Sequence, residues 1–325
     1  MLHRPPPLDP ECEAVLVAAP WLAASLTPER IAALRIAAAK LRPTAEDLCR
    51  NGAIDVEEHD AELAGGHRLA ITVLRPRHHS GPRPGLCYFH GGGMVAGDRW
   101  TGLSQVLDYV EELGIVVASA EYRLAPEHPY PLPLDDCFAA LQWLDSMRTM
   151  LALDDSGLIL AGTSAGGGLA AGVAVRVALR GGGVRLSDLV LSAPMLDDRA
   201  RFPSSVMLDG SAPWDRHSNR TGWEALLGDS AGGDEVSAQA VPARAHDLSG
   251  LPALFVDVGA VETFRDEAID FAVRAVQAGV AVELHVWGGA FHGFESLAPD
   301  SAVAKEARAT RLAYLRRRLR HRSTR

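Results

Sequence analysis

Residues 162–166 read Gly-Thr-Ser-Ala-Gly, a G-x-S-x-G pentapeptide that constrains the fold of this chain more than any other feature. The apolar run at 158–161 predicts a strand before it, and residues 167–179 predict a helix after it. A serine on a tight turn between strand and helix is typical of a nucleophile elbow. The helix N-terminus adds positive potential there, so Ser164 is predicted to be a nucleophile. The alternative, a small-residue turn without chemistry, is disfavoured by this context.

Short apolar runs alternate with helical windows along most of the chain, separated by turns rich in Pro and Gly. This alternation predicts an α/β fold with a mostly parallel sheet covered by helices on both faces. The predicted strands are residues 69–74, 85–89, 114–120, 158–161, 189–192, 252–258 and 282–287. The predicted helices are residues 10–41, 134–150, 167–179, 265–278 and 303–319.

Two stretches depart from this alternation and are predicted to form a helical cap. Residues 1–60 are the N-terminal helical segment, where Thr27 suits an N-cap and Pro28 a first helical position. Residues 195–249 are a polar insertion between two strands, and insertions of this length are usually lids. The α/β core is then residues 61–194 and 250–325. Met94, Trp100, Trp214 and Trp223 are candidates for contacts with a bound ligand, and the sequence favours none of them over the others.

A glycine-rich loop, His90-Gly91-Gly92-Gly93, follows the strand predicted at 85–89. Consecutive glycines leave backbone N–H groups unhindered, which an oxyanion hole requires. Glycine-rich loops also bind phosphates, but neither G-x-G-x-x-G nor G-x-x-x-x-G-K-[ST] is present here. His90 is expected to fix the loop and not to act as a base.

The predicted base is His292, because it follows the last predicted core strand and completes the order serine, acid, histidine. The acid is expected just after the strand at 252–258. Glu262 is nearest that strand end, whereas Asp266 and Glu267 fall in the opening turn of the next helix, where acids commonly complement the dipole. Glu262 is therefore favoured, with Asp266 as the alternative.

The charge balance restricts the possible partners. The formal net charge is −9, and an acidic protein is a poor match for nucleic acid as its main partner. An arginine-rich C-terminal end could bind anionic lipid or nucleic acid, but it is interpreted as a helix C-terminus with a solvated end. Its residues are Arg316, Arg317, Arg318, Arg320, Arg322 and Arg325.

Four cysteines show no C-x-x-C pair and no spacing with histidines typical of metal ligands. They suggest a reducing compartment and no structural metal. The apolar stretch at 15–24 is too short to span a membrane and follows acidic residues, unlike a secretory signal. A cytoplasmic location without stable membrane insertion is therefore predicted.

Taken together, these segments resemble the hormone-sensitive lipase-like family of α/β-hydrolases, also called bacterial family IV esterases. The resemblance rests on residues 90–93, the Tyr-Arg-Leu-Ala-Pro-Glu-His-Pro run at 122–129, the elbow at 162–166 and Phe-His-Gly-Phe at 291–294. The Leu-Asp-Pro at 8–10 and the helices after it also look like that family's cap. The resemblance covers almost the whole chain.

The resemblance implies an α/β-hydrolase fold with an eight-stranded, mostly parallel sheet and a helical cap. It implies a carboxylesterase that hydrolyses short-to-medium acyl esters without a cofactor. Ser164 is then the nucleophile and His292 the general base, and backbone N–H groups of Gly92, Gly93 and Ala165 form the oxyanion hole. A homodimer is possible, as in relatives.

The chain departs from the family pattern at two positions. Thr163 stands where many members carry Asp, which places the chain in the branch with a Gly-Thr-Ser-Ala-Gly elbow. Residues 262–264 read Glu-Thr-Phe where the acid motif usually reads Asp-Pro-Leu, so Glu262 aligns with the family's aspartate.

Two other functions are open at this point. A lactone, arylamide or formamide hydrolase would use the same triad and the same transition-state geometry. A non-catalytic small-molecule receptor on this fold is the third possibility, although such proteins usually lose a triad member, and both Ser164 and His292 are present.

Overall fold

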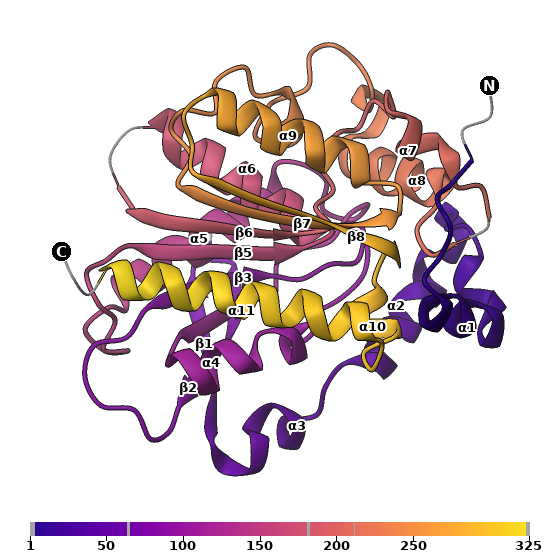
Figure 1. Cartoon of the computed structure of the whole chain (residues 1–325). Coiled ribbons are helices and arrows are strands. Elements are labelled where there is room, and N and C mark those ends of the chain that lie inside the picture. The colour runs from indigo at the N-terminus through magenta and orange to yellow at the C-terminus, as the bar shows by residue number, and fades with distance from the viewer. Residues whose placement is uncertain (1–3, 64–65, 181–182, 211, 323–325) are drawn as a thin grey trace.

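The computed structural model describes residues 4–63, 66–180, 183–210 and 212–322; for residues 321 and 322 it describes the main chain only. Its centre is an eight-stranded sheet with the strand order β1-β2-β4-β3-β5-β6-β7-β8 (Figure 1). The strands are β1 Ile54–Glu62, β2 Arg68–Pro76, β3 Gly85–Phe89, β4 Val116–Ala120, β5 Leu158–Thr163, β6 Leu186–Ser192, β7 Ala253–Val261 and β8 Val282–Phe291. β1 and β2 pair antiparallel, as do β2 and β4, and the remaining pairs are parallel. The predicted fold class is confirmed.

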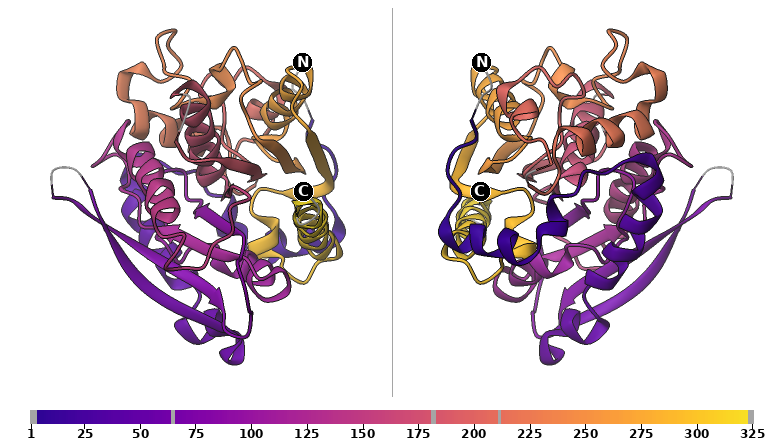
Figure 2. Two further views of the ribbon diagram at one scale, coloured as in Figure 1. Left: turned by 90° about the vertical axis from the view of Figure 1, so that its left-hand side faces the viewer. Right: turned by 90° about the vertical axis from the view of Figure 1, so that its right-hand side faces the viewer.

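Helices cover both faces of this sheet, with α6 and α9 on one side and α4 and α11 on the other (Figures 1 and 2). The α-helices are α1 Pro10–Ala18, α2 Ile31–Leu41, α3 Ala45–Cys49, α4 Leu107–Leu113, α5 Leu132–Ser146, α6 Ala165–Arg180, α7 Pro203–Met207, α8 Arg216–Leu227, α9 Arg265–Gln277, α10 Phe294–Leu297 and α11 Ala302–Arg322. Short 3-10 helices are η1 Pro20–Ala23, η2 Pro28–Arg30, η3 Arg50–Gly52, η4 Leu103–Gln105, η5 Gly228–Ser230 and η6 Pro242–Arg244.

The two cores follow from the alternation of side chains along each strand. On β3, Leu86 and Tyr88 pack in the cluster that includes α4 and α11, whereas Cys87 and Phe89 pack in the cluster that includes α5, α6 and α9. Strands buried on both faces are continuously apolar, which is why the central strands were recognisable in the sequence.

The first strand, β1, is not among the strands predicted from the sequence, and most of it falls within the range 1–60 predicted as the N-terminal helical segment. Its sequence, IDVEEHDAE, is too acidic to be recognised as a strand. β1 is an edge strand whose acids pair with arginines of β2 and of the residue just after it: Asp60 pairs with Arg68, Glu57 with Arg75, and Asp55 with Arg77, which follows β2. Cross-strand ion pairs and charge at an edge replace the apolar pattern of a central strand.

The continuous helix predicted at 10–41 is also wrong. Pro20 and Pro28 divide this stretch into α1, two 3-10 turns and α2, because proline lacks the N–H that a helix interior needs. Thr27 makes no capping hydrogen bond with its side chain, whereas Asp9 caps α1 by accepting from the N–H groups of Glu11 and Cys12.

The N-terminal helices contact the 195–249 insertion and the loop that follows β3. Ser25 donates to Asp215 at 2.5 Å, and the Leu26 N–H donates to Ser218 Oγ at 2.8 Å, which joins this segment to α8. Arg35 of α2 donates to the carbonyl oxygens of Val95 and Ala125. The division into cap and core at these boundaries stays a prediction.

The C-terminal helix anchors itself to the sheet through a buried arginine. Arg311 is 2% exposed, and its guanidinium pairs with Asp257 of β7 at 3.0 Å and with Glu295 of α10. Further along α11, Arg316, Arg317 and Arg318 pair with Glu112, Glu283 and Asp188. The first three arginines of the arginine-rich end are therefore paired side chains on a helix; the side chain of Arg322 and the whole of Arg325 lie outside the described part of the chain.

Replacing Arg311 by methionine should destabilise the fold strongly. The substitution leaves Asp257 and Glu295 buried without their cation, which typically costs about 3–5 kcal/mol. Chemical denaturation of R311M against wild type measures this loss. R317M is the matched control on the same helix, because the Arg317–Glu283 pair is largely exposed and should contribute about 1 kcal/mol or less. Equal stability of the two variants would contradict the prediction.

Candidate active site

The Ser164 turn has the geometry of a nucleophile elbow. β5 ends at Thr163 and α6 begins at Ala165, leaving Ser164 at φ +57°, a left-handed conformation that is uncommon for a residue with a side chain. Its N–H donates to the Ser192 carbonyl at 2.8 Å, and its carbonyl accepts from the Met195 N–H at 3.0 Å. Main-chain contacts to the end of β6 thus hold the strained residue.

Glycine is required on both sides of this turn. A Cβ on Gly162 would lie 2.2 Å from the carbonyl oxygen of Gly166, and a Cβ on Gly166 would lie 2.0 Å from that of Phe89. Both contacts involve backbone, which cannot move aside as a flexible side chain can. The glycines of the motif therefore allow β3, β5 and α6 to approach closely.

His292 and Glu262 complete a hydrogen-bonded relay with Ser164. The Ser164 Oγ lies 3.0 Å from His292 Nε2, and His292 Nδ1 lies 3.0 Å from Glu262 Oε1. Glu262 is fully buried, and its other oxygen accepts from the Gly259 N–H at 2.8 Å. The edge of the Phe264 ring meets the imidazole of His292 at a centroid distance of 5.0 Å. The structure thus brings together the three residues predicted from the sequence.

Asp266, the alternative acid, lies elsewhere. Its carboxylate accepts from the Ser204 N–H at 2.8 Å and pairs with Arg265 at 2.7 Å. Burial opposes ionisation, but the hydrogen bonds from Arg265 and Ser204 lower the pKa of Asp266 below its ordinary value. Asp266 joins the first turn of α9 to α7 and makes no contact with His292.

The glycine-rich loop lies directly against the elbow. A Cβ on Gly91 would meet the Thr163 carbonyl oxygen at 3.1 Å and the Ser164 Cβ at 3.2 Å. Gly92 and Gly93 have φ values of +125° and +63°. Their N–H groups have no hydrogen-bond partner among the described residues, and Ala165 is the first residue of α6, so its N–H has none within the helix. In the described part of the chain the three N–H groups are thus left without main-chain partners, and their role as an oxyanion hole stays a prediction.

Buried aromatic packing fixes this loop. His90 is fully buried, stacks on Tyr122 at 4.1 Å and hydrogen-bonds the Gly91 carbonyl at 2.8 Å through Nδ1. Tyr122 donates to the His90 carbonyl at 2.8 Å. Burial lowers the pKa of His90, which favours the neutral ring. These contacts agree with the expected supporting role of His90.

The 122–129 run is likewise held by structural contacts. Arg123 makes two hydrogen bonds to the buried carboxylate of Asp136 with its side chain. Glu127 pairs with Arg35 of α2 at 2.7 Å, and hydrogen bonds from Arg35 lower the pKa of Glu127 to about 2. This run connects the loop after β4 to the N-terminal segment.

Among the four candidates for ligand contacts, Trp214 is the one that lies beside the glycine-rich loop. Its ring occupies the space of a Gly93 side chain, since a Cβ there would lie 1.9 Å from Trp214 Cη2. Trp214 also has a positive φ of +56°, and its carbonyl accepts from Thr263 Oγ1 at 2.7 Å. Sequence alone could not separate Trp214 from the other candidates, because nothing in it signals this conformation.

The other three candidates have different surroundings. Trp100 donates to Thr72 and Glu58 at the edge of the sheet, and Trp223 is buried on α8. Met94 is fully buried, and its Cε lies 3.6 Å from the position of a Gly168 Cβ, so it packs against α6.

Among the described residues, one group has donor atoms close enough for a metal ion: Asp209, Asp215 and His217. Asp215 already serves as the N-cap of α8, and His217 hydrogen-bonds Asp209 at 2.9 Å. None of its three residues belongs to the relay, and the predicted lack of a metal or other cofactor stays a prediction. Within the same residues, no helix combines the length and apolar character that a bilayer span needs.

Comparisons with known proteins agree with this geometry. Residues 86–296 match the family described as alpha/beta hydrolase fold. Carboxylesterase NlhH of Mycobacterium tuberculosis is 32% identical over 270 residues, which cover 81% of this chain and 83% of that protein. Human hormone-sensitive lipase is 31% identical over 207 residues, covering 63% of this chain and 18% of that larger protein.

A solved structure is similar over nearly its full length. A bacterial heroin esterase superposes with a TM-score of 0.85 at 35% identity, covering 96% of this chain and 98% of that one. The matched family, the coverage of the relatives and the Ser–His–Glu relay lead to one assignment: the chain belongs to the α/β-hydrolase family, in its hormone-sensitive lipase-like branch.

Proposed function

We propose that this protein is a serine carboxylesterase that hydrolyses short-to-medium acyl esters through an acyl-enzyme on Ser164. The observation that carries the proposal is the pair of 3.0 Å contacts linking Ser164 Oγ, His292 and Glu262. The relatives named as esterases support the same reaction class. The Gly-Thr-Ser-Ala-Gly elbow supports assignment to the branch with that motif.

In the first half of the reaction, His292 Nε2 accepts the hydroxyl proton as Ser164 Oγ attacks the ester carbonyl carbon. Glu262 accepts a hydrogen bond from Nδ1, which fixes the tautomer and stabilises the imidazolium that forms. The carbonyl oxygen becomes an oxyanion, and the N–H groups of Gly92, Gly93 and Ala165 donate to it. Collapse of this intermediate breaks the bond to the alcohol oxygen, which takes the proton from His292.

In the second half, water replaces the alcohol. His292 removes a proton from the water as its oxygen attacks the acyl carbon, and the same N–H groups stabilise the second oxyanion. Return of the proton to Ser164 Oγ releases the carboxylic acid and regenerates the relay. No step of this proposed mechanism uses a metal or an organic cofactor.

The remaining sequence-based predictions are part of this proposal. A small ester is the expected partner, nucleic acid is not, and the protein is expected in the cytoplasm without stable membrane insertion. A homodimer is consistent with the open edge of β8, the last strand of the sheet. A lactone or arylamide substrate would use the same groups, so comparing a simple ester with the matching lactone and amide distinguishes these reactions. Binding without turnover would instead support the receptor hypothesis.

Ser164→Ala tests the proposed nucleophile. Wild type should hydrolyse p-nitrophenyl acetate and butyrate faster than octanoate and palmitate, in the presence of a chelator. S164A should lose at least about 10⁴-fold in kcat, since the remaining groups give only residual catalysis. A mutant that keeps the wild-type rate, or a wild type inactive on all four esters, would overturn the assignment.

Glu262→Gln tests the acid against its neighbour. Glutamine has similar volume but cannot stabilise the imidazolium as a carboxylate does, so kcat should fall by about 10²–10⁴-fold. Asp266→Asn is the matched control, because Asp266 contacts Ser204 and Arg265 instead of His292. The prediction fails if D266N loses more kcat than E262Q.

The base mechanism predicts a loss of activity in acid. His292 accepts the Ser164 proton only when neutral, so kcat/KM should fall by about tenfold per pH unit once the imidazole is protonated. An acid-stable ester and a constant ionic strength are needed for this measurement. A rate that is flat from mildly alkaline to clearly acidic pH would argue against a histidine base.

A further inference from the structure

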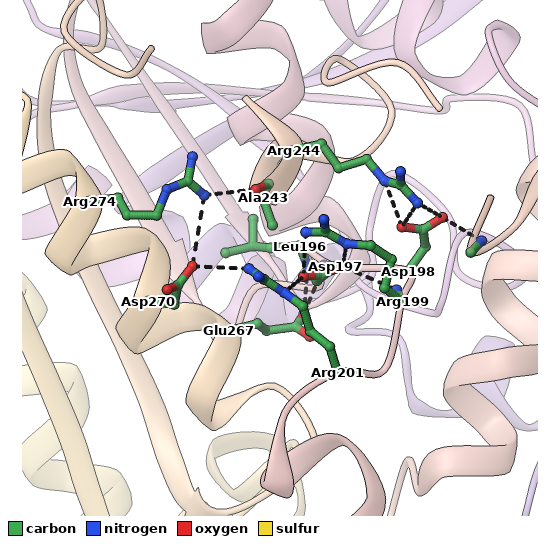
Figure 3. A network of polar contacts seen from close by, with 11 residues as sticks. Leu196, Asp197, Asp198, Arg199, Arg201, Ala243, Arg244, Glu267, Asp270 and Arg274 are labelled. Atoms are coloured by element: carbon green, nitrogen blue, oxygen red, sulfur yellow. Dashed lines mark hydrogen bonds and ion pairs between the residues drawn. The ribbon is translucent and has the colours of Figure 1, made fainter. Parts of the chain in front are cut away.

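A polar network joins both ends of the 195–249 insertion to α9 (Figure 3). Asp270 pairs with Arg201 at 3.3 Å, and Arg274 donates to the Ala243 carbonyl at 2.7 Å. The third member from α9, Glu267, differs from these two because it is fully buried. The three residues follow the i, i+3, i+7 spacing of one helix face.

Glu267 binds main chain and not a cation. Its Oε1 accepts from the Leu196 N–H at 2.7 Å and from the Asp197 N–H at 3.3 Å. Its Oε2 is buried and has no partner among the described residues. The nearby guanidinium groups of Arg199 and Arg201 bond instead to the Asp197 carboxylate (Figure 3).

The surroundings of Glu267 favour its neutral form. It lies near two other buried carboxylates, Asp197 and Glu262, and it bonds to no arginine among the described residues. Burial, together with these two negative charges, raises the pKa of Glu267 well above its ordinary value, although the two backbone N–H groups oppose the shift. Asp197 behaves oppositely: burial is outweighed by hydrogen bonds from Arg199 and Arg201, which lower its pKa.

The main chain that Glu267 holds also contacts the nucleophile. Residues 192–197 leave β6 and pass the elbow, where the Ser192 carbonyl and the Met195 N–H bond the two main-chain polar groups of Ser164. The Met195 carbonyl packs so closely on α6 that a Cβ on Gly168 would lie 2.2 Å from its oxygen. Glu267 fixes this segment immediately after Met195.

We propose that Glu267 is a positioning residue that, as a neutral carboxylic acid, holds residues 195–197 in place and thereby the main chain of Ser164. Glu267 touches neither substrate nor His292. It acts through two backbone hydrogen bonds, and its neutrality leaves Glu262 as the negative charge that serves His292. This inference rests on the proposed esterase function.

Three variants of Glu267 separate this role from general stabilisation. E267Q keeps an acceptor for both N–H groups without a charge, so its kcat should stay within about twofold of wild type. E267M removes the acceptor at similar volume and should lower kcat roughly 10- to 100-fold with KM within about threefold, because small displacements of reacting groups cost this much. E267D retracts the carboxyl group by one methylene and should also lower kcat. This second variant provides the test if E267M does not fold.

D270N is the matched control on the same helix face. It weakens the pairs with Arg201 and Arg274 but leaves residues 195–197 held, so kcat should be unchanged. Circular dichroism and thermal unfolding show which variants are folded. A folded E267M or E267D with wild-type kcat, or an E267Q that loses kcat as E267M does, would overturn the proposal.

Infrared spectroscopy tests the neutral state directly. The difference spectrum of wild type minus E267Q at neutral pH should show the C=O stretch of a protonated carboxylic acid, and its absence would refute neutrality. The S164A variant distinguishes failure of the positioning role from failure of the proposed esterase function. If wild type is active and S164A is inactive, Glu267 variants that do not behave as predicted refute only the positioning role. If S164A retains activity, the proposed function itself has failed.

Discussion

The left-handed main chain of Ser164 is the constraint on which the rest of the site depends. A serine at φ +57° is unfavourable by itself, and it persists because neighbouring backbone leaves it no alternative. Gly162 and Gly166 admit carbonyl groups where any Cβ would collide, and residues 192–195 bond both polar groups of the Ser164 main chain. The strand order makes these contacts possible, because β3 and β6 flank β5 on either side.

Two buried glutamates close together in sequence have opposite roles in the proposed mechanism, and their surroundings decide which. Glu262 accepts from the Gly259 N–H and faces an imidazole that becomes positive during the reaction, so a negative charge is useful there. Glu267 meets only two backbone N–H groups and lies near other carboxylates, so its neutral form is favoured. Residue type alone assigns neither role, because burial and partners set the charge state.

The sequence predicts well what depends on local pattern. The elbow, the glycine-rich loop and His292 each combine a short motif with a neighbouring strand, and the structure brings them together. The local pattern does not predict β1, because its acids are compensated by Arg68 and Arg75 of β2 and by Arg77 just after it, so its strand character lies in the pairing and not in its own apolar residues. Glu267 was interpreted as a dipole-complementing acid because nothing local to 265–278 reveals that Leu196 and Asp197 bury it. Pairing with the next strand in the first case, and contact with a segment distant in sequence in the second, cannot be read from the local pattern.

Helix α9 connects the triad to the cap. It starts just after Glu262, buries Glu267 against the segment that supports Ser164, and carries Asp270 and Arg274, which hold the two ends of the insertion. Because Asp270 and Arg274 hold the insertion near its two ends, we expect that substitutions in the chain between those ends leave the Ser164 turn in place. Trp214 lies in that intervening chain and contacts the glycine-rich loop at Gly93. Its carbonyl accepts a hydrogen bond from Thr263, the residue after Glu262. Under the proposed esterase function, Trp214 and the triad therefore share a scaffold but not the same hydrogen bonds, so a change in the insertion is expected to alter substrate preference more than the chemistry at Ser164.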